Sequence, residues 1–234
     1  MSDFIVHSIP GSPYGRAVLA TLEEKGADYR FAAVQPGTLK LEPHLSRHPF
    51  GKIPVLQHGD FTPYETQAIL RHLDRVFPSP PLTPSDARSA ALMDQAMGVN
   101  DWHLFQGVSN IIGFQRVVGP MIMGLTPDEA VIAEAMPRAQ AVFAELERMI
   151  TGQDYFAGKS VSLVDLLLAP QIDFFVGTPR VGDLDRVATQ PRGVARADER
   201  ARQYGENDLA DGRGTRQGGL NALSKRACTQ PLSV

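Results

Sequence analysis

The chain has 234 residues, 43% of them hydrophobic and 21% charged, so it can bury one large core or two smaller ones. Its net charge of −3 and pI of about 6.1 exclude the strongly basic footprint of a nucleic-acid-binding protein. The single cysteine, Cys228, excludes an internal disulfide framework and favours a reducing compartment. Neither a signal-peptide pattern nor a long apolar run is present, so we expect a cytoplasmic protein without a membrane span.

The first eighty residues predict a compact α/β unit. Apolar strands are expected at residues 4–7 and 29–34, with a helix between them that begins after Ser12 and stops at Gly26. Pro13 suits the first position of that helix. A loop with a possible short helix at 39–47, strands at 54–56 and 61–64, and a helix at 65–77 complete the order β-α-β-α-β-β-α.

The segment from Gly51 to Leu56 places a proline where a strand begins. Because proline cannot donate to a ladder, Pro54 suits a first or edge position, and we expect the main chain of Val55 to stay free for an added peptide strand. Glu65 and Thr66 then open an apolar helix, whose free N–H groups and dipole attract a carboxylate. Free main-chain groups on a strand, next to a helix start that attracts anions, suit the binding of a short peptide with a free carboxylate.

A proline-rich linker at residues 78–84 separates this unit from a helical second part. Helices are expected at 86–98 and on towards 117, from Thr126 (N-cap) and Pro127 (N1) to about 150, and after Ser162. Ser162 and Asp165 resemble a capping box, and the apolar helix that follows them should be buried. We therefore expect domains at 1–78 and 85–178, and an atypical, disordered tail at 179–234, where apolar periodicity ends.

Four motifs in order resemble those of the cytosolic glutathione S-transferases, in their serine-type, bacterial-like classes. They begin at Ser12, Pro49, Tyr64 and Ser162, and the likeness covers roughly residues 3–178. The resemblance implies a thioredoxin-like N-terminal domain, an all-α C-terminal helical domain, glutathione as co-substrate and a homodimer. It implies conjugation of glutathione to small electrophiles. Glutathione-dependent isomerisation, peroxide reduction, or glutathione binding without catalysis are the alternatives on the same fold.

The resemblance also implies roles for individual residues. Ser12 would donate a hydrogen bond to the glutathione sulfur, or would serve only as a helix cap; Tyr14 and, less favoured, Ser8 are its rivals. The other implied glutathione contacts come from the loop, the proline strand and the second helix: Lys40, Lys52, Ile53, Pro54 (in a cis bond), Val55, Glu65 and Thr66. Thr66 would hold the γ-glutamyl carboxylate and Glu65 the amino group.

The second substrate is expected to meet the first long helix of the helical part. An aromatic and apolar stretch on this helix, which equally suits an ordinary bundle core, consists of Trp102, Phe105, Ile111, Ile112 and Phe114. The six histidines show no metal-ligand spacing, so no metal site is predicted: His7, His44, His48, His58, His72 and His103.

The tail departs from the family, which normally continues with further helices. Residues 190–201, back-translated with permitted codons and read one nucleotide later, give an amphipathic helix of the family type. Our hypothesis is a single-nucleotide slip near residues 178–181. Gene sequencing or the intact mass of the native protein would test it.

Overall fold

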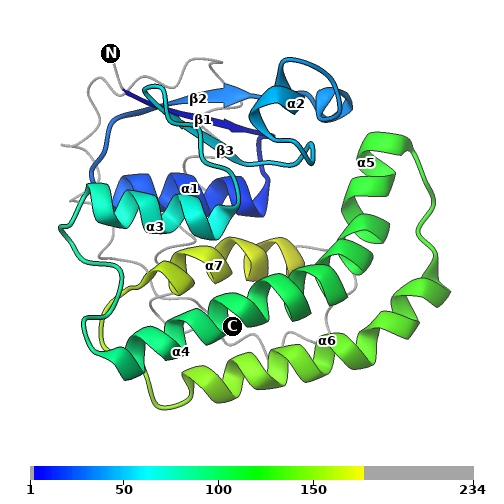
Figure 1. The fold of residues 1–234 in the computed structure, drawn as a ribbon. Helices are drawn as coiled ribbons and strands as arrows, with labels where there is room; N and C mark the ends of the chain where they lie inside the picture. Colours follow the sequence, from blue (N-terminus) through cyan, green and yellow to red (C-terminus); the bar gives the residue numbers. More distant parts are fainter. Residues whose placement is uncertain (1–2, 177–234) are drawn as a thin grey trace, which may run out of the picture.

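The computed structural model describes residues 3–176, which form a small sheet, two helices beneath it and a layer of longer helices below them (Figure 1). The tail predicted at 179–234 lies outside the described residues. No helix in the described part is both long and apolar enough to cross a membrane.

The sheet has three strands in the order β2-β1-β3. They are β1 (Phe4–Ser8), β2 (Tyr29–Ala33), parallel to β1, and β3 (Val55–His58), antiparallel to β1. The strand predicted at 61–64 is reduced to two isolated bridges, Val55–Tyr64 and His58–Phe61. Pro63 lies inside that segment and has no N–H to extend the ladder, although its carbonyl accepts from Leu56 N at 3.1 Å.

Two helices pack under the sheet, α1 (Pro13–Glu24) and α3 (Thr66–Val76). The apolar face of each helix is buried, α1 packing against β1 and α3 against β3. A 3₁₀ turn (Pro36–Thr38) and the short α2 (His44–Arg47) lie in the connection between β2 and β3.

The helical layer starts with one long rod. It consists of α4 (Ala87–Gly98), the π-type helix η2 (Val99–Val118) and α5 (Gly119–Met123). The antiparallel α6 (Glu129–Ile150) packs along η2. The predicted N-cap at Thr126 is wrong: Asp128 caps α6, because its carboxylate accepts from both Ala130 N and Val131 N, at 3.0 and 3.3 Å.

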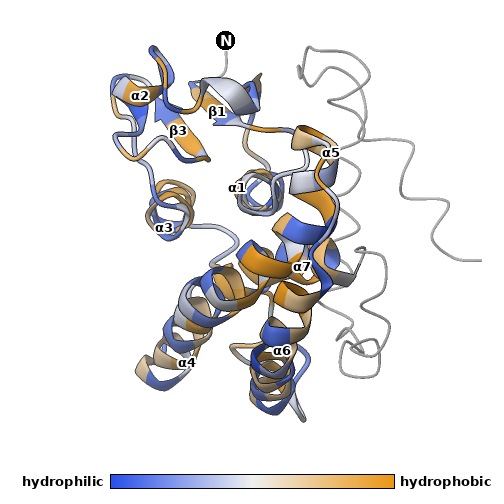
Figure 2. Cartoon of the chain, turned by 90° about the vertical axis from the view of Figure 1, so that its right-hand side faces the viewer, coloured by the Kyte–Doolittle hydropathy of each residue, from blue (hydrophilic) through white to orange (hydrophobic). Residues whose placement is uncertain are grey.

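The last described helix, α7 (Leu163–Val176), joins the two layers by packing against α1, α4 and η2. Hydrophobic residues run along most of it (Figure 2), and its burial confirms the expectation from sequence. At its start Asp165 accepts from Ser162 N and Ser162 Oγ, at 2.9 and 2.5 Å, so the acidic half of the predicted capping box is present. Arg16 of α1 donates to Asp173 of α7 at 2.7 Å.

Candidate active site

Ser12 is the N-cap of α1 and half-buried. Its Oγ accepts from Gly15 N at 3.3 Å, which satisfies one of the free N–H groups at the helix start. A hydroxyl has one hydrogen to donate besides its lone pairs. Among the described residues the structure records no acceptor for the Ser12 O–H, so capping and donation to a sulfur are compatible.

Ser8, one rival of Ser12, is fully buried at the end of β1. Its Oγ lies directly under Gly15, where a Cβ would approach it to 2.3 Å. Ser8 therefore faces the packed strand–helix contact, and its buried hydroxyl is closed off from a substrate.

Tyr14, the other rival, is held by the helical layer. Its hydroxyl donates to Asp101 Oδ1 at 2.8 Å, and Asp101 Oδ2 accepts from Gln67 Nε2 at 2.6 Å. Burial and the neighbouring Asp101 charge raise the pKa of Tyr14 well above its ordinary value. Since this proton is already committed to a carboxylate, the geometry favours Ser12 over Tyr14 as the donor to a thiolate.

The Asp101 cluster was missed by sequence reasoning. Asn100 adds a third donor to the same carboxylate, 2.8 Å from Asp101 Oδ1. Asp101 lies on η2, whereas Tyr14 and Gln67 lie in the first turns of α1 and α3, so only the packing of the two layers brings them together. No spacing in the sequence signals it.

The Ile53–Pro54 peptide bond is cis, as the resemblance implied. Val55 is not free, however: it lies fully buried in β3, paired with His7 of β1, and it bridges to Tyr64. The expectation of an open main chain at Val55 is therefore wrong. Within residues 3–176 no hydrogen bond is recorded for the main chain of Ile53, which makes Ile53 the candidate for pairing with a peptide.

Glu65 turns the chain into α3 with a φ of 67°, the only positive φ among the described non-glycine residues. Such a conformation costs on the order of 1–3 kcal/mol and tends to occur at functional sites. The Glu65 side chain is exposed, and it makes no capping bond to the helix. The first-turn N–H groups, with the buried Thr66 beside them, therefore receive no cap from Glu65, and such a helix start suits an anion.

The loop before Pro54 is fastened by groups from the α2 region. His44, which is buried, donates from Nε2 to the Lys52 carbonyl at 2.8 Å, and Lys40 Nζ donates to the Phe50 carbonyl. The side chains of both Lys40 and Lys52 are exposed. Each ammonium is accessible to a carboxylate, and Lys40 also secures the loop.

The strand register places these segments at one end of the sheet. His7, at the end of β1, faces Val55 at the start of β3, and Val55 bridges to Tyr64 just before α3. The end of β1 also leads directly to Ser12. The Ser12 turn, the Ile53–Pro54 segment and the start of α3 thus lie at the same end of the sheet.

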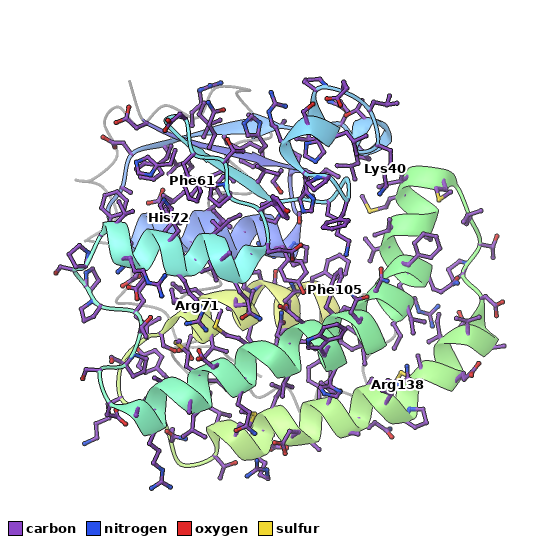
Figure 3. The ribbon with its side chains drawn as sticks, in the orientation of Figure 1. Lys40, Phe61, Arg71, His72, Phe105 and Arg138 are labelled. Atoms are coloured by element: carbon purple, nitrogen blue, oxygen red, sulfur yellow. The ribbon has the colours of Figure 1, made fainter. Side chains whose placement is uncertain are left out.

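The helical layer borders this end of the sheet. Phe105 of η2 makes an edge-on contact with the Tyr14 ring at 4.8 Å, and Figure 3 shows it below the loop that carries Lys40. Of the predicted aromatic stretch, Trp102 is 75% exposed, whereas Ile112 is fully buried and belongs to the core. A small pocket beside Ser12 opens on the other flank of α1, towards Leu19 and Phe31 of β2, and does not include Ile53 or Thr66.

Comparison with known proteins identifies the family of both parts of the chain. Residues 6–81 match the family model of the glutathione S-transferase N-terminal domain, and residues 110–184 match that of the C-terminal domain. Glutathione S-transferase F7 of Arabidopsis thaliana is 30% identical over 182 residues, which are 76% of this chain and 87% of that protein. Glutathione S-transferase F6 of the same plant is 32% identical over 183 residues, 76% of this chain and 86% of that protein.

Solved structures give the same result. Glutathione S-transferase I from maize, in complex with an atrazine glutathione conjugate, aligns with a TM-score of 0.74 and 28% identity over 87% of this chain and 96% of its own. Both domains, their order and the thioredoxin-like arrangement of the first are thus shared. The chain belongs to the glutathione S-transferase family.

Proposed function

We propose that this chain conjugates the thiolate of glutathione to electrophilic small molecules, with Ser12 as the hydrogen-bond donor to the sulfur. A free thiol has a pKa of about 8.5, so little thiolate is present at neutral pH, and the thiolate is the nucleophile. A donor at the sulfur and the positive end of α1 both favour the thiolate. The observation that carries this role is the Ser12 O–H, which no described acceptor takes up.

The remaining contacts follow from the shape of a γ-glutamyl tripeptide. Its γ-glutamyl carboxylate would lie at the N–H groups beside Thr66, with Glu65 towards the amino group. The cysteinyl part would pair with the main chain at Ile53, next to Pro54 and Val55. The glycyl carboxylate would then lie towards the exposed ammonium groups of Lys40 and Lys52.

The electrophile would approach from the helical layer, where Phe105 and the Tyr14 ring present an aromatic wall. The attack forms a carbon–sulfur bond, and the electrophile loses a leaving group or takes up a proton. A homodimer and a cytoplasmic role in detoxification are parts of the same proposal. Light scattering of the purified chain tests the dimer.

The matched pair Ser12→Ala and Ser12→Thr tests the catalytic role, because threonine keeps both the hydroxyl and the cap. We expect Ser12→Ala to lower kcat/KM for a chloronitrobenzene by about 10- to 100-fold, as for a lost hydrogen bond to a charged group. The pH profile should shift towards the pKa of a free thiol, and Ser12→Thr should recover most of the rate.

Unchanged activity and pH profile in Ser12→Ala would refute this role. Retention of the wild type on immobilised glutathione without turnover of any electrophile would favour the binding-protein alternative. Turnover of peroxides or isomerisable substrates, with no conjugation, would favour the other enzymatic alternatives.

A further inference from the structure

Two histidines from different elements face each other at the far end of the sheet from Ser12. His58 is the last residue of β3, and His72 lies in the middle of α3. Nδ1 of His58 is 3.1 Å from Nε2 of His72. Fourteen positions separate them in sequence, so their spacing alone did not predict a site.

Both rings are held in place by aromatic neighbours. Phe4 stacks on the His58 ring at 4.2 Å and 21°, and Phe61 packs edge-on against the His72 ring at 5.1 Å. Figure 3 shows Phe61 and His72 side by side, well away from Lys40. The packing therefore keeps the two nitrogens close together, so a modest rotation of each ring is enough for both to face one ion.

The separation of the nitrogens suits a shared metal ion. Imidazole nitrogen binds zinc and similar ions at about 2.0–2.1 Å, so two nitrogens this far apart subtend an angle of about 100° at the metal. That angle lies between the square-planar and tetrahedral values that Cu²⁺ and Zn²⁺ adopt.

We propose that His58 and His72 form a binding site for a divalent transition-metal ion, Cu²⁺ or Zn²⁺, that ties β3 to α3. Each ring would turn its lone pair to the metal and keep its proton on the other nitrogen. Within residues 3–176 no third histidine, cysteine, aspartate or glutamate completes a set of three ligands, so water fills the remaining positions. The site is about 10 Å from Val55 along β3, so it is independent of the proposed conjugation.

Zinc-dependent thermal stability of the full chain tests the site. A Cys228→Ser background removes the thiol as a competing ligand. We expect Zn²⁺ to raise Tm by about 4 °C for each tenfold excess over its Kd, since only the folded chain joins the two elements. His58→Gln and His72→Gln should abolish this shift, whereas His103→Gln, which removes an exposed histidine of η2, should keep it.

Copper binding gives a second readout that does not depend on stability. In the same background the electron paramagnetic resonance spectrum of one equivalent of Cu²⁺ should show two coupled nitrogens, and fewer in His72→Gln. A zinc shift of equal size in His72→Gln, or no metal effect on the wild type, would overturn the proposal and leave the pair as a structural hydrogen bond.

Discussion

The Tyr14 hydroxyl donates to Asp101 at 2.8 Å, and through this carboxylate the start of α1 is tied to the start of α3. Gln67, next to Thr66, donates to the other carboxylate oxygen. One side chain of the helical layer therefore spans the two helix starts that the proposed glutathione site uses. This contact gives Tyr14 a positioning role, which is consistent with the proposal that Ser12 donates to the sulfur.

Tyr14→Phe should separate these two roles. We expect it to lower the free energy of unfolding by about 1 kcal/mol, because Asp101 loses one donor, and to change kcat/KM by less than about threefold. Tyr155→Phe is the matched control, since the described structure gives the Tyr155 hydroxyl no partner. Denaturant unfolding and a chloronitrobenzene assay measure both. A loss of activity as large as that of Ser12→Ala would assign the thiolate to Tyr14 instead.

Gly15→Ala should destabilise the turn that carries Ser12. The new Cβ would lie 2.3 Å from Ser8 Oγ and 3.0 Å from Ser8 Cβ, inside the buried contact of β1 with α1. We expect a loss of about 1–3 kcal/mol on denaturant unfolding, typical of overpacking. Gly98→Ala is the control: with nothing within 4 Å of its Cβ, it should stabilise α4 by about 0.5–1 kcal/mol.

The double variant Ser8→Gly with Gly15→Ala provides the decisive comparison. If the clash with Ser8 is the cause, the effects of the two single changes will not add, and the double variant will recover most of the loss from Gly15→Ala. Simple additivity would place the cost elsewhere in the turn.

Local signals in the sequence predicted most of the secondary structure. Ser12 with Pro13 marked the start of α1, and Ser162 with Asp165 marked α7, because caps act over three or four residues. The same rule misplaced the start of α6. Thr126 and Asp128 are both residues that cap helices, and in the structure Asp128 is the N-cap. Sequence propensity also gave no sign that the middle of the long rod is a π-type helix.

In the candidate site, too, residues in local motifs were predicted, whereas contacts between segments distant in sequence were not. Ser12, Pro54 and Thr66 were predicted because each lies in a contiguous motif. Asp101 and His44 were missed because their partners are distant in sequence and are met only after the layers pack. Val55 was misjudged for a related reason: its pairing with His7 depends on the sheet register, which a single strand does not reveal.

The Lys25–Asp74 pair should be a main support of the junction between the domains. Lys25 Nζ, which is fully buried, donates to Asp74 Oδ1 at 2.6 Å and to the Pro80 carbonyl, and Asp74 also accepts from Leu82 N and Thr83 Oγ1. Lys25→Ala leaves a poorly solvated carboxylate, so we expect a loss of about 3–5 kcal/mol on denaturant unfolding. Arg148→Ala, which breaks an exposed pair with Glu145, should cost less than about 1 kcal/mol.

The same pair predicts a pH dependence of stability. Burial alone would raise the pKa of Asp74, but the hydrogen bonds from Lys25, Thr83 and Leu82 outweigh it and lower the pKa below its ordinary value. The contribution is therefore present above the unfolded pKa of about 3.9 and is lost as the pH falls through the lower, folded value. Urea unfolding between pH 6 and pH 2 should show this loss in the wild type and a shallower dependence in Asp74→Asn. Parallel curves would contradict it.

Gln171→Leu should stabilise the protein. The Gln171 side chain is fully buried in α7, and neither its Nε2 nor its Oε1 has a hydrogen-bond partner among the described residues. An unsatisfied buried amide costs about 1–3 kcal/mol, and leucine fills a similar volume without that cost. We expect a gain of about 1–3 kcal/mol on denaturant unfolding, whereas Gln140→Leu on the exposed face of α6 should change little. A loss of stability in Gln171→Leu would mean that the amide is satisfied, for example by a buried water.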